Sequence, residues 1–263
     1  MWAVTSSFIK NLFNLDNLSS ILASVIYSCN YKLYFLWLWI YNEPDRADVI
    51  IFNEQQHNIH DENIHTKLQC KRKYCEQCRI KRLVMYLYNA KHSIDVAQLA
   101  ISHIDMYLAL EDAWLRGVNV RIVTDGQMVR VRGTITYYLF KLGIPIRLES
   151  SGFVLHHKFA IIDGEPRILE LEQDQQRWYT RLWSRTGFVM TGSLNWTRQG
   201  TMKNFENVVA ISNRSVQQFY QPIFDEMWIR FHPLEIEDFE FRDVENKIVS
   251  RIATQINDVR KFY

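Results

Sequence analysis

The sequence predicts an α/β protein with a mixed β-sheet, helices on both of its faces, and an apolar segment before it. Between residues 48 and 231, short apolar runs of strand length alternate with amphipathic stretches of helix length. The chain has 263 residues, 48% of them hydrophobic and 23% charged, so it is large enough to bury a core and is not disordered. Four cysteines are too few for a disulfide scaffold.

The first half of this region predicts three strands and two helices. DVIIF at Asp48–Phe52 is a short apolar run, and apolar and polar residues alternate in His92–Leu99, so both are predicted strands. Apolar residues recur at helical spacing in Cys78–Ala90 and Ile104–Arg116, and a glycine ends the second of these helices. VNVRIVTD at Val118–Asp125 is a strand that ends in a carboxylate.

The second half continues the alternation. Helices are predicted where apolar residues recur at helical spacing, at Thr134–Leu142 and Ser215–Phe231. Strands are predicted at Ile144–Leu148, Phe153–Asp163, Phe188–Thr191 and Glu206–Ser212. Residues 232–263 form a tail that is first acidic and then, at Val244–Phe262, helical on the surface and outside the core.

The charge is segregated although the formal net charge is only +2. Between Lys71 and Arg82 there are six basic residues and one acid, whereas between Glu235 and Glu245 there are six acids and one base. A charge run is most often a solvated face. Net charge says nothing about distribution, so the small total does not exclude a nucleic-acid partner.

Residues 1–47 form an apolar amino-terminal segment that we interpret as a membrane anchor. The run from Ile21 to Tyr41 has the roughly 20 residues that a membrane-spanning helix needs, but Asn30 and Lys32 interrupt its middle. The aromatic residues at its end suit a membrane interface. The alternative is a buried or partly disordered helix.

The chemistry is concentrated in the predicted strand Phe153–Asp163. It contains His156, Lys158 and Asp163 in the spacing His-x-Lys-x4-Asp. Side chains two apart in a strand share a face, which would bring His156 beside Lys158. A histidine can attack phosphorus and a lysine can hold a phosphate oxygen. Asp163, at the end of the strand, could orient an imidazole or receive a proton.

Two downstream segments complete a three-part pattern. Ser193 and Asn195, in GSLNWT, are small and amide side chains that could donate hydrogen bonds to the same phosphate. Glu206 opens the next strand and could hold the second nitrogen of His156, as active-site histidines require.

HHKFAIIDG, TGSLNWT and ENV together resemble the HKD motif of the phospholipase D superfamily, and most closely its mitochondrial branch, Zucchini or mitochondrial cardiolipin hydrolase. The similarity covers Asp48 to Phe231. It implies that His156, Lys158, Asp163, Ser193, Asn195 and Glu206 form the catalytic set. The superfamily site uses two such motifs and this chain has one, so the resemblance implies a homodimer that shares one active site. It also implies cleavage through a phosphohistidine without a catalytic metal.

The resemblance leaves more than one function open. The first is a single-strand-specific endoribonuclease of piRNA biogenesis, with piRNA-pathway proteins as partners, and the basic block favours it. The second is a phospholipase that converts cardiolipin to phosphatidic acid. The third is an inactive membrane scaffold, against which the complete motif argues. For the enzymes, the resemblance implies a single-pass protein in the mitochondrial outer membrane, close to its lipids, with the catalytic domain facing the cytosol.

Cysteines crowd into a short element, residues 57–78, that is a candidate for structural zinc. Cys70, Cys75 and Cys78 supply three thiolates, and a structural zinc takes four ligands. The resembled family has a zinc element here, and His57 is the fourth ligand we favour, with His60 and His65 as alternatives. A reduced loop without metal is the other interpretation.

Residues 165–186 are an insertion relative to the resembled family, in which the HKD strand leads almost directly into the GS motif. The segment is polar with scattered aromatic residues, and we expect a hairpin loop outside the core, since long surface insertions cost little closure entropy. A mispredicted exon would give the same pattern.

Overall fold

The computed structural model describes residues 46–53, 75–131, 133–173 and 187–239. The predicted membrane anchor, most of the predicted zinc element, the second half of the insertion and the predicted carboxyl-terminal helix lie outside these residues. Among the helices that are described, none combines the length and the apolarity needed to cross a membrane.

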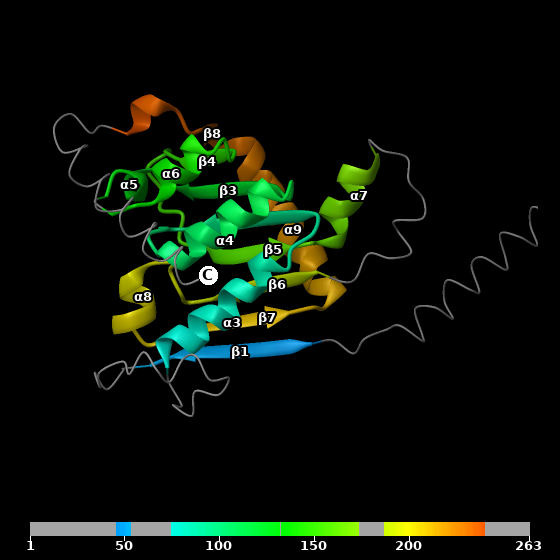
Figure 1. Cartoon of the computed structure of the whole chain (residues 1–263). Helices are drawn as coiled ribbons and strands as arrows, with labels where there is room; N and C mark the ends of the chain where they lie inside the picture. The colour runs from blue at the N-terminus through cyan, green and yellow to red at the C-terminus, as the bar shows by residue number, and fades with distance from the viewer. Residues whose placement is uncertain (1–45, 54–74, 132, 174–186, 240–263) are drawn as a thin grey trace, which may run out of the picture. The chain divides into compact units, whose positions relative to one another are not determined.

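A single eight-stranded sheet organises the described residues, in the order β1-β7-β6-β5-β2-β3-β4-β8 (Figure 1). Strands β2, β3 and β4 are parallel, and the other neighbours pair antiparallel. The mixed sheet predicted from the sequence is therefore confirmed. The strands are β1 Ala47–Phe52, β2 Ser93–Gln98, β3 Asn119–Asp125, β4 Ile146–Glu149, β5 Lys158–Ile162, β6 Phe188–Gly192, β7 Glu206–Ile211 and β8 His232–Pro233.

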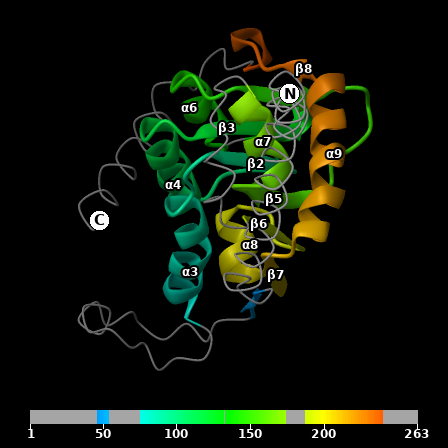
Figure 2. The same ribbon diagram turned by 90° about the vertical axis from the view of Figure 1, so that its right-hand side faces the viewer.

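Helices cover both faces of this sheet, as predicted. Figure 2 shows α3 and α4 on one side of the strands and the long α9 on the other. The described helices are α3 Glu76–Tyr88, α4 Ile104–Leu115, α5 Gly126–Val129, α6 Thr136–Lys141, α7 Glu165–Gln173, α8 Arg198–Lys203 and α9 Arg214–Arg230, with a short 3-10 helix at Ile236–Asp238.

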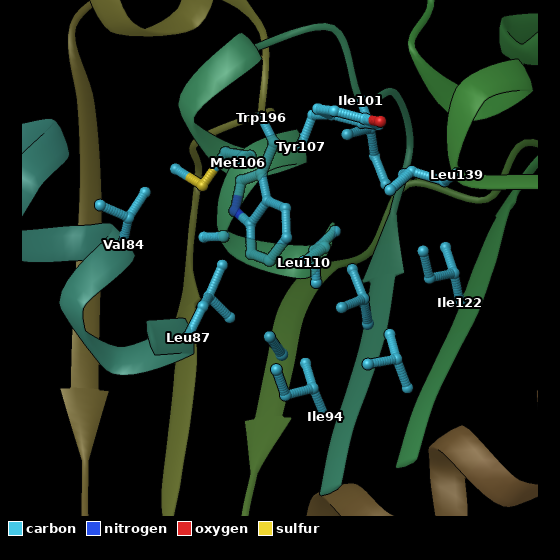
Figure 3. Close-up of a cluster of buried hydrophobic side chains, with 14 of the residues drawn as sticks. Val84, Leu87, Ile94, Ile101, Met106, Tyr107, Leu110, Ile122, Leu139 and Trp196 are labelled. Atoms are coloured by element: carbon cyan, nitrogen blue, oxygen red, sulfur yellow. The ribbon is translucent and has the colours of Figure 1, made fainter. Parts of the chain in front are cut away.

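Two hydrophobic clusters, one on each face, fix the sheet between the helices. The larger one packs α3 and α4 on residues such as Ile94 and Ile122, and Trp196 lies in its centre (Figure 3). The smaller one packs α9 on Phe159 and Ile161. Alternate residues of β5 therefore enter opposite clusters, which is the period-two pattern of a strand buried on both faces.

Polar side chains cap several of the helices and so fix where they begin. Asp125 caps α5 and Asn213 caps α9, each by accepting hydrogen bonds from backbone N–H groups of the first turn. Thr197 and His103 do the same for α8 and α4. Side-chain acceptors at this position stabilise a helix by about 1 kcal/mol.

The carboxyl-terminal boundary predicted at residue 231 is too early. His232 and Pro233 form β8, which pairs with Leu148 and Arg147 at the edge of the sheet. Phe239 is also buried in the larger cluster. Proline is acceptable here because an edge strand does not need every backbone donor. The first residues of the acidic stretch thus belong to the fold.

The insertion is not a hairpin loop in its first half. Residues Glu165–Gln173 form α7, which packs on α9 and buries Ile168 and most of Arg167. The segment looked polar, but one apolar residue and one arginine with a partner are enough to dock a short helix. Arg167 donates to the Asn119 side chain over 2.9 Å.

Candidate active site

Strand ends from across the sheet meet along one side, which we call the His156 edge. It comprises the carboxyl ends of β2, β3, β4 and β6 and the amino ends of β5 and β7. Figure 1 shows α5 and α8 at this side and α7 at the opposite side. Ligands of open α/β sheets bind at the carboxyl ends of parallel strands, so this edge is where a site is expected. It carries Gln98, Asp125, Glu149, Lys158, Ser193 and Glu206.

His156 and His157 lie just before β5 and not within it. The strand begins at Lys158, so the prediction of one long strand from Phe153 was wrong. Both histidine side chains are exposed. The His157 ring packs edge-on against Phe159, with 5.5 Å between the ring centroids. The Lys158 ammonium donates to the His156 carbonyl oxygen over 2.9 Å and so ties the histidine segment to the strand.

The GSLNW segment presents its polar residues by simple alternation. Leu194 and Trp196 are buried, whereas Ser193 is exposed and Asn195 is half-buried. Gly192 is required before this segment, since a Cβ there would lie 2.1 Å from the Asn207 carbonyl oxygen.

A hydrogen-bonded group joins Ser193 to Glu206. The Ser193 hydroxyl donates to Glu206 Oε2 and accepts from the Asn207 N–H over 3.0 Å. Asn204 donates to Glu206 Oε1 over 2.9 Å. Both carboxylate oxygens thus have partners, and within the described residues neither partner is His156. The expected support of the His156 imidazole by Glu206 is not seen in the single chain.

Lys158 is electrostatically coupled to Glu206. Partial burial lowers the pKa of Lys158 from its usual value, and the negative charge of Glu206 opposes that shift. Burial likewise lowers the pKa of His157, with smaller effects from the charges of Lys158 and His156. The edge therefore holds a lysine cation whose charge depends on a neighbouring carboxylate.

Two buried amide oxygens at this edge have no hydrogen-bond partner among the described residues. They are Asn195 Oδ1 and Gln98 Oε1. Gln98 is directly opposite Lys158 in the β2–β5 register, which places both side chains on one face of the sheet. Buried polar atoms without partners are costly, and a bound ligand or water can satisfy them. Gln98 could not be recognised from the sequence, because only the strand pairing brings it beside Lys158.

Asp163 does not join the site. It ends β5 at the opposite edge, five residues from Lys158, or about 16 Å along the strand. Its backbone is left-handed, with φ of 48°, and its carboxylate accepts from the N–H groups of Lys91, His92 and Ser93 over 2.7–3.1 Å. In the single chain, the Asp163 carboxylate therefore contacts backbone N–H groups and is not beside the His156 imidazole that it was expected to orient. Asp163 fixes the end of β5 to the start of β2.

Carboxylates from β3 and β4 hold the loop that carries His156. Asp125 Oδ2 accepts from the Leu155 N–H over 3.1 Å, while its Oδ1 accepts from the Gln127 and Met128 N–H groups. Glu149 accepts from the Ser151 N–H over 2.6 Å and also from its hydroxyl. Sequence reasoning marked Asp125 only as the end of a strand. Its position as the last residue of the strand was the available signal, but its contact with Leu155 depends on the fold.

A cleft of about 560 Å³ opens beside His156 on the α9 side of this edge. It is lined by Glu149, Phe153, Val154, Leu155, His156, His157, Glu226, Met227, Arg230 and Phe231. Phe153 is 73% exposed and Val154 is 59% exposed, so the loop offers apolar surface at the mouth of the cleft.

One arginine of the basic block, Arg82, has a defined place on the surface. Arg82, in the middle of α3, pairs with Asp48 at the start of β1 and lines a second hollow, of about 990 Å³, which also contains Asp163. It therefore does not lie beside His156. Exposed cations at the His156 edge come instead from Arg198 and Lys203 on α8 and from Arg130 after α5.

Cys75 and Cys78 are the candidate zinc ligands within the described residues. Cys75 is buried at the cap of α3 and Cys78 is half-buried in its first turn, and such spacing places them on one side of the helix start. The pair fits the second half of a four-ligand zinc site. His57 and Cys70, and the alternatives His60 and His65, lie outside the described residues. Among those described, no group of three candidate ligands occurs.

The fold and the residues at the His156 edge define a phosphodiesterase of the phospholipase D superfamily. Residues 83–228 match the family described as cardiolipin synthase, PLD-like domain. The nuclease Nuc from Salmonella typhimurium, a phospholipase D family member, has the same fold, with a TM-score of 0.52, 22% identity, and coverage of 73% of this chain and 99% of Nuc.

Within that superfamily, the chain belongs to the branch of the mitochondrial cardiolipin hydrolases, the Zucchini branch that its motifs predicted. It is 30% identical to the Drosophila melanogaster protein of that name over 72% of this chain and 77% of the relative. It is 31% identical to the human protein over 61% of this chain and 55% of the relative. The Xenopus tropicalis protein is also 31% identical, over 63% of this chain and 68% of the relative.

Proposed function

We propose that the protein is a single-strand-specific endoribonuclease. The observation that carries this proposal is the open His156 edge, where exposed His156 and half-buried Lys158 share one edge of the sheet with the exposed cations Arg198, Lys203 and Arg130. A strand of RNA presents a phosphate at every nucleotide, so cations on both sides of the reacting phosphate contribute to binding. A lipid with one or two phosphates would not need them.

In the proposed reaction, His156 attacks phosphorus through an imidazole nitrogen. A phosphorus–nitrogen bond forms and the bond to the leaving oxygen breaks, and that oxygen takes a proton from His156 of the partner subunit. Water then attacks the phosphohistidine, gives its proton back to the partner's His156, and releases the 5′-phosphate product. The Lys158 ammonium and the Asn195 amide hold the phosphate oxygens, and the Ser193 hydroxyl joins them when it turns away from Glu206, so charge and hydrogen bonds take the place of a catalytic metal.

The proposal requires a homodimer, because one chain supplies one such histidine. His157 is not the second histidine of this site, because its ring packs on Phe159 and partial burial lowers its pKa. A two-fold axis at the His156 edge would bring the two His156 side chains to one phosphate.

Cardiolipin hydrolysis to phosphatidic acid is the second candidate. The names of the relatives and the exposed apolar residues Phe153, Val154 and Phe205 near His156 support it. By family resemblance we also propose a place at the mitochondrial outer membrane, anchored once by residues 1–47 with the catalytic domain in the cytosol, and a role in piRNA biogenesis with its proteins. An inactive scaffold is the least supported reading of a complete catalytic set.

The decisive experiment is a side-by-side assay of the full-length dimer on single-stranded RNA and on cardiolipin. We expect RNA cleavage that survives a chelator, and loss of cleavage in His156→Asn. His157→Asn is the matched control, because it removes the adjacent imidazole and should retain most activity. Turnover of cardiolipin with intact RNA would replace the proposal with the second candidate, and cleavage by His156→Asn would refute the phosphohistidine mechanism.

We further propose a structural zinc held by His57, Cys70, Cys75 and Cys78, with His60 or His65 as alternative fourth ligands. Zinc would fix residues 57–78 against the start of α3, and it would take no part in the chemistry. Metal analysis should give one zinc per chain, reduced by Cys75→Ser and Cys78→Ser but not by His92→Asn. A zinc content near zero in protein prepared without chelator would exclude this site.

A further inference from the structure

The cleft beside His156 has a mixed lining, in which apolar side chains and ionisable side chains are equally represented. Its walls come from the loop Phe153–His157 on one side and from the last turns of α9 on the other. Phe231 and Leu155 are buried in its floor, while Phe153 is 73% exposed at its mouth. Its volume of about 560 Å³ lies within the range of small-ligand sites.

The charges of the lining argue against a second phosphate in this cleft. Glu149 and Glu226 oppose the single guanidinium of Arg230. Hydrogen bonds from Ser151 keep the pKa of Glu149 below its usual value against the effect of burial, so this carboxylate stays ionised at neutral pH. A neutral ring with N–H donors fits such walls, whereas the second phosphate of a lipid such as cardiolipin would be repelled by them.

The cleft is held in a fixed place relative to the reacting histidine. Asp125 fixes Leu155, next to His156, and Glu149 fixes Ser151. A group bound against Phe153 therefore has a set distance to a phosphate held at His156 and Lys158.

We propose that this cleft is a nucleobase subsite, in which the base next to the scissile phosphate stacks on Phe153. The inference rests on the proposed RNA cleavage and adds the chemical class that occupies the space beside it. Stacking on an aromatic side chain tolerates any base, because every base has a π-face. The acceptor oxygens of Glu149 and Glu226 can receive N–H groups at the edge of the base.

The test compares an intact single-stranded RNA with a second RNA, made in two versions, that lacks one base. In the second RNA, the nucleotide beside a marked linkage is abasic, on its 5′ side in one version and on its 3′ side in another, and product length reports cleavage there. We expect removal of the base on one side to lower kcat/KM at that linkage about ten-fold, within the range that base stacking contributes. In Phe153→Ala, intact and abasic RNA should be cleaved at equal rates.

Two variants sharpen the comparison. Phe153→Leu keeps an apolar side chain without a ring, so it should also lose the discrimination. Phe219→Ala is the matched control, since Phe219 is 76% exposed on α9 but does not line the cleft, and it should keep the ten-fold difference.

Failure of the nucleobase subsite and failure of the proposed nuclease function give different results. If the unmodified protein cleaves both RNAs equally, the subsite is refuted and the nuclease remains. If it cleaves no RNA, the proposed function itself is refuted. If Phe153→Ala becomes monomeric by light scattering, the cleft mouth is covered by a second copy of the chain and the subsite is refuted. If Phe153→Ala loses cardiolipin turnover and keeps RNA discrimination, the occupant is a lipid.

Discussion

Asp163 shows how one carboxylate of a catalytic motif can serve the fold. Its left-handed backbone is a conformation that aspartate tolerates better than most residues, and its carboxylate accepts hydrogen bonds from three consecutive N–H groups. We expect Asp163→Ala to lower the free energy of unfolding by about 2–3 kcal/mol, as hydrogen bonds to a charged group are lost. Urea unfolding measures this change.

The turnover of the Asp163→Ala variant distinguishes a structural role of Asp163 from a catalytic one. Below its unfolding temperature, Asp163→Ala should retain much of its turnover, because Asp163 is remote from His156. Asp112→Ala is the control, since Asp112 pairs with Arg116 on the surface and should cost only a few tenths of a kcal/mol. A stable Asp163→Ala protein without turnover would contradict the structural role.

Lys158 and Glu206 make a prediction about pH. The charge of Glu206 raises the pKa of Lys158 against the lowering by burial, so removing it should lower that pKa further. If charged Lys158 holds the phosphate, activity falls as pH rises through its pKa. In Glu206→Gln the alkaline limb of the kcat/KM profile should therefore move to lower pH. Glu226→Gln, in the neighbouring cleft, should leave that limb in place, and an unmoved limb in Glu206→Gln would show that Lys158 is not the titrating group.

For single residues, the sequence predicted well which side chains come together, and it predicted less well the role of each one. His156, Lys158, Ser193 and Glu206 come to one edge, because the motif places them at adjoining strand ends. Asp163 lies far from Lys158 because five residues of extended strand separate them. The motif spacing gives this number of residues, but the distance follows only once the segment is known to be a strand. Residues such as Gln98 became visible only with the strand pairing, which joins positions far apart in the chain.

Among the elements, the loop from Ser150 to His157 determines the position of the site. Asp125 serves two ends at once, since it caps α5 and holds the Leu155 N–H. We expect Asp125→Ala to lower kcat between ten- and a hundred-fold with a smaller change in KM, because small displacements of a reacting group have effects of about this size. Hydrogen exchange should show faster exchange at the Leu155 amide.

Asn213→Ala is the matched control for this prediction. Asn213 also caps a helix, α9, through the Val216 N–H, but it does not contact the loop. Both variants should lose about 1 kcal/mol of stability from the cap. Equal losses of kcat in the two variants would mean that destabilisation, and not the position of the loop, explains the effect.

The elements were mostly predictable, and the errors share a cause. Apolar periodicity located β2, β3, α4 and α9 because their burial is visible in a local window. It missed β8, whose two residues are exposed and are recognisable only by their pairing with β4, and α7, which buries Ile168. It also extended β5 backwards over His156, because an apolar loop and an apolar strand look alike in sequence.

For the whole molecule, the proposed shared site predicts the behaviour of mixed dimers. A dimer that contains one unmodified chain and one His156→Asn chain can be isolated by tandem affinity tags on the two chains. If one His156 attacks and the other protonates the leaving oxygen, this dimer lacks one of the two functions. Its kcat should fall about a hundred-fold or more, the size of a general-acid contribution.

If each chain worked alone, the mixed dimer would keep about half of the activity, since half of its sites would be intact. Tagged dimers of two unmodified chains control for the tags, and mixed dimers with His157→Asn control for the loss of an imidazole at this edge. A mixed dimer with half the activity would place a complete active site in each chain, and the second acid would then have to come from this chain's own residues near Lys158.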